Sequence, residues 1–337
     1  MDNNREIAKE MISQLNKVIL GKESFIFEVV SAILANGHIL LEDIPGVGKT
    51  TLALAVSKLM GLQWNRVQFT PDVLPSDLTG FSIYRRETEK FVYQPGAVFC
   101  NLLLADEINR TSPKTQSALL EVMEEMQVTV DGVTRDVPYP FLVIATQNPL
   151  GTVGTQPLPP AQMDRFLVCM TMGYPDFGSE ILMAKELDGG KRTEKLTPIT
   201  NAETLVKMQK EVEEVFVNEA IYEYIVRLIT ATRNSEYLNM GVSPRGTISL
   251  VKIAKAASWL KGKDFVSPSE VYDLFPAIAR HRVQTSAKAR IDGINKEEIL
   301  QGILKSIEMP SFKRMWLYEK NNIFYLSYSH FLLSRNT

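Results

Sequence analysis

The stretch Pro45-Gly46-Val47-Gly48-Lys49-Thr50-Thr51 decides how this sequence folds. Its glycines let backbone N–H groups turn inward onto phosphates, Lys49 can reach the β- and γ-phosphates, and the Thr50 hydroxyl can ligate Mg²⁺. The apolar residues 38–41 ahead of it have the character of a buried strand, and residues 50–60 place apolar side chains on one helical face. Strand, glycine loop and helix in this order are typical of a phosphate-binding α/β unit, so we predict a bound nucleotide.

The loop departs from the full phosphate-binding pattern at one position. That pattern has a glycine six residues before the lysine, where this chain has Asp43. We expect Gly46 to absorb the bend. The alternative interpretation is a glycine-rich turn in which Gly-Lys-Thr occurs by chance.

Two carboxylates end a second apolar run. Asp106 and Glu107 follow residues 102–105 directly, about 55 residues after the phosphate loop. An open α/β sheet binds its ligand at the ends of its strands, so these side chains are expected beside the loop. Asp106 is predicted to hold Mg²⁺ through water, and Glu107 to orient and deprotonate the attacking water. The alternative is an ordinary solvated strand end.

Composition limits the classes of protein that this chain can belong to. Its 337 residues suggest about two domains, and its two cysteines argue against a disulfide scaffold. Three histidines leave little material for a zinc site. The net charge of −2 disfavours a protein that depends on nucleic-acid phosphates. No apolar run is long enough to cross a membrane, and no secretion signal is recognisable, so we expect a cytoplasmic protein without direct membrane insertion.

The pattern of elements predicts an α/β core over residues 1–174 and helices alone over 175–308. Buried strands are predicted at 102–105, 141–145 and 166–170, an extended insert at 67–99, and a helix at 113–126. Asp131-Gly132 predicts the turn of a hairpin at about 128–139. Thr200-x-x-Glu203 and Ser267-x-x-Glu270 are typical capping boxes. The aromatic-rich residues 309–337 form a C-terminal tail with three possible interpretations. It packs on the lid or a neighbouring subunit, it docks a partner, or it is not native.

Two long strings make the chain resemble the MoxR family of AAA+ ATPases. One runs from Asp106-Glu107-Ile108-Asn109-Arg110 through Pro113-Lys114-x-Gln116-x-Ala118-Leu119-Leu120-Glu121, and the other is Gln68-Phe69-Thr70-Pro71-Asp72-x-Leu74-Pro75-x-Asp77-x-x-Gly80. The resemblance spans about residues 18–310. It implies a P-loop αβα nucleotide-binding core with a helical lid, assembled into a ring that is commonly a hexamer.

The resemblance also implies roles for single residues. Asn148 looks like the sensor-1 residue that positions water beside Glu107, as opposed to an asparagine in a strand-end turn. Arg165 resembles the arginine finger that reaches the γ-phosphate of the neighbouring subunit, its alternatives being an intrachain ion pair or a solvated side chain. Arg245 resembles the sensor-2 arginine that reaches the phosphates of its own chain, although a surface arginine at a helix start is also compatible. Pro160 stands where relatives usually carry glutamate.

Further segments gain expected roles in the same way. Residues 18–21, with Ile19 and Gly21, match the segment that lies against adenine, although helix-end core packing has the same pattern. The insert at 67–99 and the hairpin at 128–139 are implied to line the pore face of the ring. The nucleotide-binding set is thus Ile19, Gly21, Pro45, Gly46, Val47, Gly48, Lys49, Thr50 and Thr51, with Thr50 and Asp106 at the metal.

The resulting expectation is Mg-dependent ATP hydrolysis by a ring motor with chaperone-like work on client proteins. The resemblance implies clients such as von Willebrand factor A-domain proteins. Two rival functions remain open: a motor stimulated by nucleic acid, and an ATP-gated scaffold that hardly hydrolyses. A P-loop metabolite kinase is a weaker alternative, because no acceptor pocket is visible in the sequence.

Overall fold

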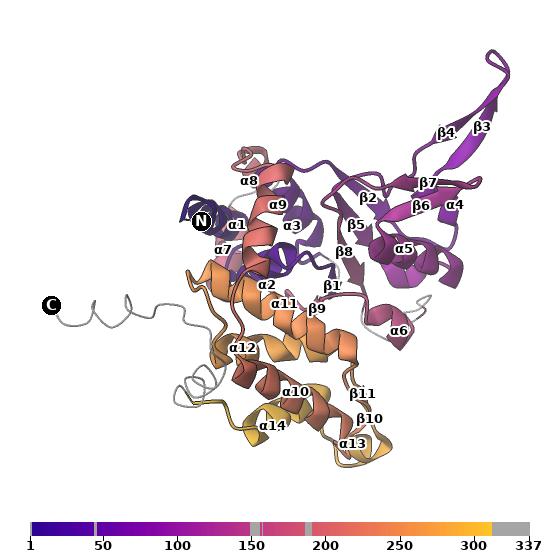
Figure 1. The fold of residues 1–337 in the computed structure, drawn as a ribbon. Helices are drawn as coiled ribbons and strands as arrows, with labels where there is room; N and C mark the ends of the chain where they lie inside the picture. The colour runs from indigo at the N-terminus through magenta and orange to yellow at the C-terminus, as the bar shows by residue number, and fades with distance from the viewer. Residues whose placement is uncertain (1, 44–45, 149–155, 157, 186–190, 312–337) are drawn as a thin grey trace.

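Five parallel strands form the central sheet of the protein, seen in a computed structural model that describes residues 2–43, 46–148, 156, 158–185 and 191–311 (Figure 1). The strand order is β2-β5-β8-β1-β9, and every neighbouring pair is parallel. The strands are β1 (Ile39–Glu42), β2 (Trp64–Gln68), β5 (Leu102–Asp106), β8 (Leu142–Gln147) and β9 (Val168–Met170). All five carboxyl ends therefore meet at one edge of the sheet, where an open α/β sheet binds its ligand.

Alternate residues of the inner strands enter two separate hydrophobic layers. Ile39 and Leu41 pack on the side of α1 (Asp2–Val18), α2 (Glu23–Leu34) and α3 (Lys49–Leu59), whereas Leu40 packs on the side of α5 (Pro113–Glu125). The period of two places successive side chains on opposite faces. Burial on both faces explains why these strands are continuous apolar runs in the sequence.

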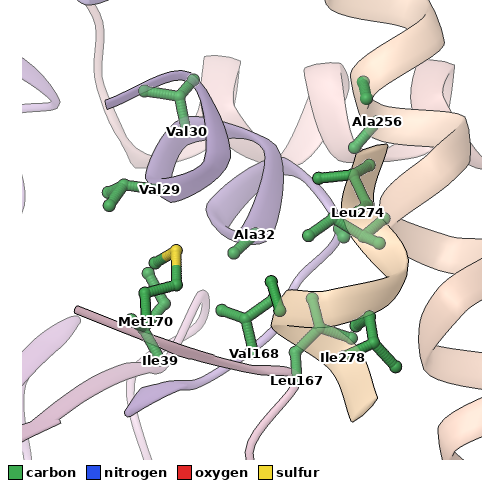
Figure 2. Packing of buried hydrophobic residues seen from close by; sticks show 14 of the residues in the cluster. Val29, Val30, Ala32, Ile39, Leu167, Val168, Met170, Ala256, Leu274 and Ile278 are labelled. Atoms are coloured by element: carbon green, nitrogen blue, oxygen red, sulfur yellow. The ribbon is translucent and has the colours of Figure 1, made fainter. Parts of the chain in front are cut away.

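The carboxyl-terminal half is a helical unit that shares the first of these layers. Its helices are α9 (Ala202–Glu213), α10 (Glu219–Arg233), α11 (Pro244–Leu260), α12 (Pro268–Ala279), α13 (Ala287–Ile291) and α14 (Lys296–Ser306). Figure 2 shows Ala32 of α2, Val168 of β9 and Ile278 of α12 gathered in one cluster. The lid is thus docked on the sheet by continuous apolar packing.

The sequence pattern predicted a lid made of helices alone, and this prediction was wrong in one detail. The short strands β10 (Leu238–Met240) and β11 (Gln284–Thr285) pair in an antiparallel manner inside it. Strands of two or three residues are too short to show a period, so the pattern gave no sign of them. After α7 (Phe177–Lys185) and α8 (Lys191–Glu194), the chain first returns over α3, where Ile199 N–H donates to Leu59 O at 2.9 Å.

Two hairpins leave the core on the side away from the lid (Figure 1). After α4 (Pro75–Thr79), strands β3 (Phe81–Arg85) and β4 (Lys90–Gln94) form a long projecting ribbon with Phe91 exposed near its end. Strands β6 (Gln127–Val130) and β7 (Val133–Asp136) form the second. Asp131 and Gly132 have φ values of 52° and 73°, as the predicted turn requires.

The remaining sequence patterns differ in how they relate to the structure. The edge strand β2 was not predicted, since its sequence, Trp64-Asn65-Arg66-Val67-Gln68, is largely exposed and polar. The predicted cap of α9 is one residue off, because Asn201 accepts from Thr204 N–H, whereas the Ser267 and Glu270 box is present. Residues 312–337 of the aromatic tail lie outside the described residues.

Glu270, the acidic residue of that capping box, is buried. Its side chain is fully covered and accepts hydrogen bonds from Ser267, Lys261 and Lys263. Burial acts to raise the pKa of Glu270, but these hydrogen bonds and the lysine charges outweigh it and lower the pKa from 4.5 to about 2. A lowered pKa in the folded state stabilises the fold above the unfolded value and loses that effect as the pH falls towards 2.

We therefore predict that Glu270→Gln lowers the free energy of unfolding by about 1–3 kcal/mol at pH 7, because a charge-assisted network becomes neutral. The difference from the wild type should shrink as the pH falls from 4.5 to about 2 in urea denaturation. Glu203→Gln, at an exposed carboxylate on α9, is the matched control and should change little. A difference that persists unchanged at pH 3 would contradict the assignment.

Candidate active site

The carboxyl edge of the sheet brings together the side chains that the sequence placed after three separate strands. The phosphate loop follows β1, Asp106 ends β5 with Glu107 directly after it, and Asn148 follows β8. Because β5 pairs with β8 and β8 with β1, these three groups are neighbours at one edge.

The phosphate loop has the backbone shape that anion binding needs. Gly46 and Gly48 have φ values of +87° and +101°, in the left-handed region that favours glycine. Lys49 opens α3 with its side chain largely buried, and its Nζ donates to Asp43 O at 2.9 Å. Thr50 and Thr51 follow in the first turn of α3, partly exposed. Val47 packs against the core, and Pro45 lies outside the described residues.

Burial is the main influence on the charge of Lys49. It lowers the pKa of the ammonium group, while the carboxylates of Asp43, Asp106 and Glu107 act in the opposite direction. In a partly desolvated loop, water stabilises the charge of a cation less than it does at the surface, even where carboxylates are near. Such a group gains strongly from a phosphate ligand.

Asp43 occupies the pattern's glycine position for a structural reason. Its φ is not in the left-handed region, so the backbone does not need glycine there. Its carboxylate is buried and accepts from Met172 N–H at 2.6 Å and Gly173 N–H at 2.9 Å. Asp43 therefore ties the base of the phosphate loop to the chain that leaves β9.

The acidic pair is held in a network of hydrogen bonds. Asp106 Oδ1 accepts from Thr146 Oγ1 at 2.7 Å, and Asp106 Oδ2 pairs with Arg66 Nη2 at 2.7 Å. Glu107 N–H donates to Thr146 Oγ1 at 2.8 Å. The Thr146 hydroxyl thus bridges the Asp106 side chain and the Glu107 backbone.

The Glu107 carboxylate lies between two donors of the neighbouring strands. Asn148 Nδ2 donates to its Oε1 at 3.1 Å, and Gln68 Nε2 donates to its Oε2 at 2.9 Å. Arg110 Nη1 also reaches Oε2 at 2.7 Å. Burial acts to raise the pKa of Glu107, but the hydrogen bonds from Arg110 and Asn148 outweigh it and the pKa is lowered. Glu107 is therefore an anion at neutral pH, as an acceptor of a proton must be.

Several of these contacts were missed by sequence reasoning. Arg66 and Gln68 lie on β2, the edge strand that the sequence pattern did not reveal. Thr146, two residues before Asn148, carries no local sign of its contact with Asp106. Had β2 been recognised, its pairing with β5 would have placed Gln68 opposite Asp106.

The two predicted arginines lie at the other edge of the sheet. Arg165 precedes β9, and Leu167 N–H donates to His38 O at the amino end of β1. Arg165 Nη2 pairs with Glu124 of α5 at 3.1 Å, and Arg245 Nη2 pairs with the same carboxylate. The five steps along the chain from His38 to Asp43 span about 17 Å when extended, so this edge is remote from the phosphate loop.

This position bears on the role that the resemblance implies for Arg245, which stays a prediction. The resemblance implied contact with the phosphates of its own chain, but in this arrangement the first turn of α11 places Arg245 at the opposite edge. The geometry instead groups Arg245 with Arg165. Both side chains are partly exposed and border a hollow between α5 and α11.

The adenine segment and the altered helix start have packing explanations. Ile19 is buried at the end of α1. A Cβ on Gly21, whose φ is +65°, would approach Asp176 Oδ2 to 2.1 Å, so glycine is needed for close packing there. Pro160 begins α6 (Pro160–Met163), a position where proline is tolerated. An adenine role for Ile19 and Gly21 stays a prediction.

Among the described residues, no helix is both long and apolar enough to cross a membrane. The same residues contain no group of three or more His, Cys, Asp or Glu side chains placed to hold a metal by themselves. A magnesium ion that uses Thr50 and Asp106 needs oxygen atoms of the nucleotide and water as further ligands, which is the usual situation for this ion.

Comparisons with known proteins agree with the architecture. Residues 38–168 match the model of the ATPase family associated with various cellular activities (AAA), and residues 230–303 match an AAA lid domain. The crystal structure of a candidate ATPase from Cytophaga hutchinsonii superposes with a TM-score of 0.83 at 36% identity, covering 92% of this chain and 96% of that one.

Relatives narrow the family further. The chain is 46% identical over 299 residues to the uncharacterized protein YeaC of Bacillus subtilis, covering 89% of this chain and 93% of that protein. It is 37% identical over 308 residues to Chaperone MoxR1 of Mycobacterium tuberculosis, covering 89% and 81%. Protein MoxR of Methylorubrum extorquens is 29% identical over 306 residues, covering 83% and 88%. With an AAA core, an AAA lid and these relatives, the chain belongs to the MoxR family of AAA+ ATPases.

Proposed function

We propose that this protein hydrolyses ATP in a Mg-dependent reaction as a closed ring, a hexamer, whose sites are shared between neighbouring subunits. One observation carries the proposal. The phosphate loop, Asp106 and Glu107 lie at one edge of the sheet, while Arg165 and Arg245 lie at the other. One chain therefore cannot bring all these groups to one phosphate, but two chains that join unlike edges can. Such head-to-tail contacts generate rings when they close.

Each residue has a role that its surroundings support. The loop from Gly46 to Thr51 and the amino end of α3 bind the phosphates, with Lys49 at the β- and γ-phosphates. Glu107 accepts a proton from the attacking water, and Asn148 holds that carboxylate in place. Mg²⁺, held through Thr50 and Asp106, would neutralise charge on the transferring phosphoryl group.

Work on protein clients is the proposed use of this hydrolysis. One relative is named a chaperone. The ribbon of β3 and β4 exposes apolar side chains, including Phe81, Tyr84 and Phe91, which would bind a client. Proteins with von Willebrand factor A domains are the first candidates, and the cytoplasm is the proposed location.

We predict that the purified protein shows Mg-dependent ATPase turnover, which Lys49→Ala abolishes by removing nucleotide binding. Glu107→Gln should still bind ATP but turn over about 10²–10⁴-fold more slowly, because the general base is lost. Phosphate release and binding of a fluorescent ATP analogue separate the two effects. A Glu107→Gln rate equal to wild type would reject the mechanism, and stimulation by DNA or RNA would favour a nucleic-acid motor.

We predict that Arg165→Ala and Arg245→Ala subunits each lose turnover but regain it when mixed with Lys49→Ala subunits. In an equal random mixture about a quarter of the interfaces join an intact loop to intact arginines, so about a quarter of wild-type activity should return. Sizing by light scattering must show that the rings remain assembled. If the Arg165→Ala mixture recovers and the Arg245→Ala mixture does not, Arg245 acts on the nucleotide of its own chain.

We predict that Asp43→Gly, although it restores the usual pattern, destabilises the protein by about 2–4 kcal/mol, because the buried N–H of Met172 and the partly buried N–H of Gly173 lose a charged acceptor. ATP affinity should also fall several-fold as the base of the loop loosens. Asp43→Asn keeps one acceptor oxygen and is the matched control with a smaller effect. Thermal melts and nucleotide titration provide the readouts. Tighter binding by the glycine variant would show that the pattern, not the tether, governs the loop.

A further inference from the structure

A buried arginine joins the lid to the core next to Arg165. Arg282, between α12 and β11, is 3% exposed. Its guanidinium donates to Asp164 Oδ1 at 2.6 Å, Phe166 O at 2.6 Å and Leu167 O at 3.1 Å. It also reaches Asp164 O at 3.2 Å, Ile278 O at 2.7 Å and Ser249 Oγ at 3.1 Å. All five N–H groups of the fork are thereby engaged, a pattern that lysine cannot reproduce.

The residue before it strengthens the same attachment. His281 Nε2 donates to Phe166 O at 3.2 Å, so two consecutive lid residues hold the short core segment 164–167. Arg165 lies inside this segment. Its backbone position is therefore determined by lid contacts on both sides, although its own side chain points to Glu124.

Asp164 extends the attachment to the second arginine. Its Oδ2 accepts from Ser243 Oγ at 2.7 Å, and Ser243 also caps α11, the helix whose second residue is Arg245. Gly246 completes the fit, because a Cβ there would approach Arg282 Cδ to 2.9 Å and Val242 Cγ1 to 2.3 Å. Glycine next to Arg245 in the sequence thus leaves the space that the Arg282 side chain occupies.

We propose that Arg282, Asp164 and Ser243 form a positioning joint that holds Arg165 and Arg245 as one unit attached to the lid. The inference rests on the proposed function, in which these two arginines act on the nucleotide of the neighbouring subunit. None of the three joint residues touches a nucleotide site itself. Through the joint, the position of a subunit's lid sets the geometry of catalysis in the next subunit.

A purely structural role for the same contacts makes a different prediction. Loss of a buried core–lid attachment would lower stability and impair the subunit's own site. A positioning role lowers the turnover number while the nucleotide affinity of the mutated subunit stays intact. It also places the defect in the neighbour, where mixing can rescue it.

The test uses the full-length ring with Arg282→Lys, which keeps the charge but loses the fork, and with the milder Asp164→Asn. We expect the turnover number to fall at least tenfold while the Kd for a fluorescent ATP analogue stays within twofold. Gly246→Ala presses on Arg282 without removing it, and provides a third variant if the first two do not assemble. The matched control is Gln209→Met, which removes a buried 2.9 Å hydrogen bond to Ile33 O that involves none of the joint residues and should keep its turnover.

Mixing then decides where the defect lies. Arg282→Lys subunits mixed with Lys49→Ala subunits should regain about a quarter of wild-type activity, since the Lys49→Ala chains supply intact joints. Unchanged turnover in an assembled Arg282→Lys ring, or no recovery on mixing, overturns the joint. Arg165→Ala in the same series is the reference. If Arg165→Ala fails to recover, the shared site itself is wrong; if it recovers and Arg282→Lys does not, only the joint is wrong.

Discussion

Parallel pairing of β1 with both β8 and β9 is the constraint on which the rest of the protein depends. It aligns every carboxyl end at one edge and every amino end at the other. The phosphate loop, the acidic pair and Asn148 thereby converge, although about 100 residues separate the first from the last. The same pairing sends Arg165, which precedes β9, to the far edge. The direction of the strands thus brings the phosphate loop, the acidic pair and Asn148 together and keeps Arg165 away from them within one chain.

Most of the fold could be predicted from sequence, because its inner strands and helices carry strong local patterns. Buried parallel strands are apolar on both faces, and the Asp131-Gly132 turn requires a rare backbone shape. The edge strand β2 could not be predicted in this way, since most of its residues are exposed and gain their conformation from pairing with β5. The cap of α9 is Asn201 and not Thr200, in keeping with the stronger capping preference of asparagine over threonine.

The part of the candidate site that could be predicted consists of residues whose type and place in a motif point to one chemical role. Lys49, Asp106, Glu107 and Asn148 lie together as expected. The partners Arg66, Gln68 and Thr146 depend on register between strands, which no local pattern specifies. The place of Arg245 depends on how the lid docks. That orientation comes from tertiary packing of α11 and α12 on α2 and the sheet, not from the sequence around the arginine (Figure 2).

The two ends of each predicted trans-acting arginine differ in a way that suits transfer between chains. At the guanidinium end, Glu124 holds both side chains at the surface, where ion pairs contribute about 0–1 kcal/mol and exchange readily. A phosphate offers more charge and more acceptor oxygens than one shared carboxylate. At the backbone end, the contacts of Arg282 and Asp164 are buried, where loss of one partner of a charged pair costs about 3–5 kcal/mol. An arginine anchored firmly at its base and weakly at its tip can leave Glu124 for a neighbour's phosphate while its backbone stays at the contact between core and lid.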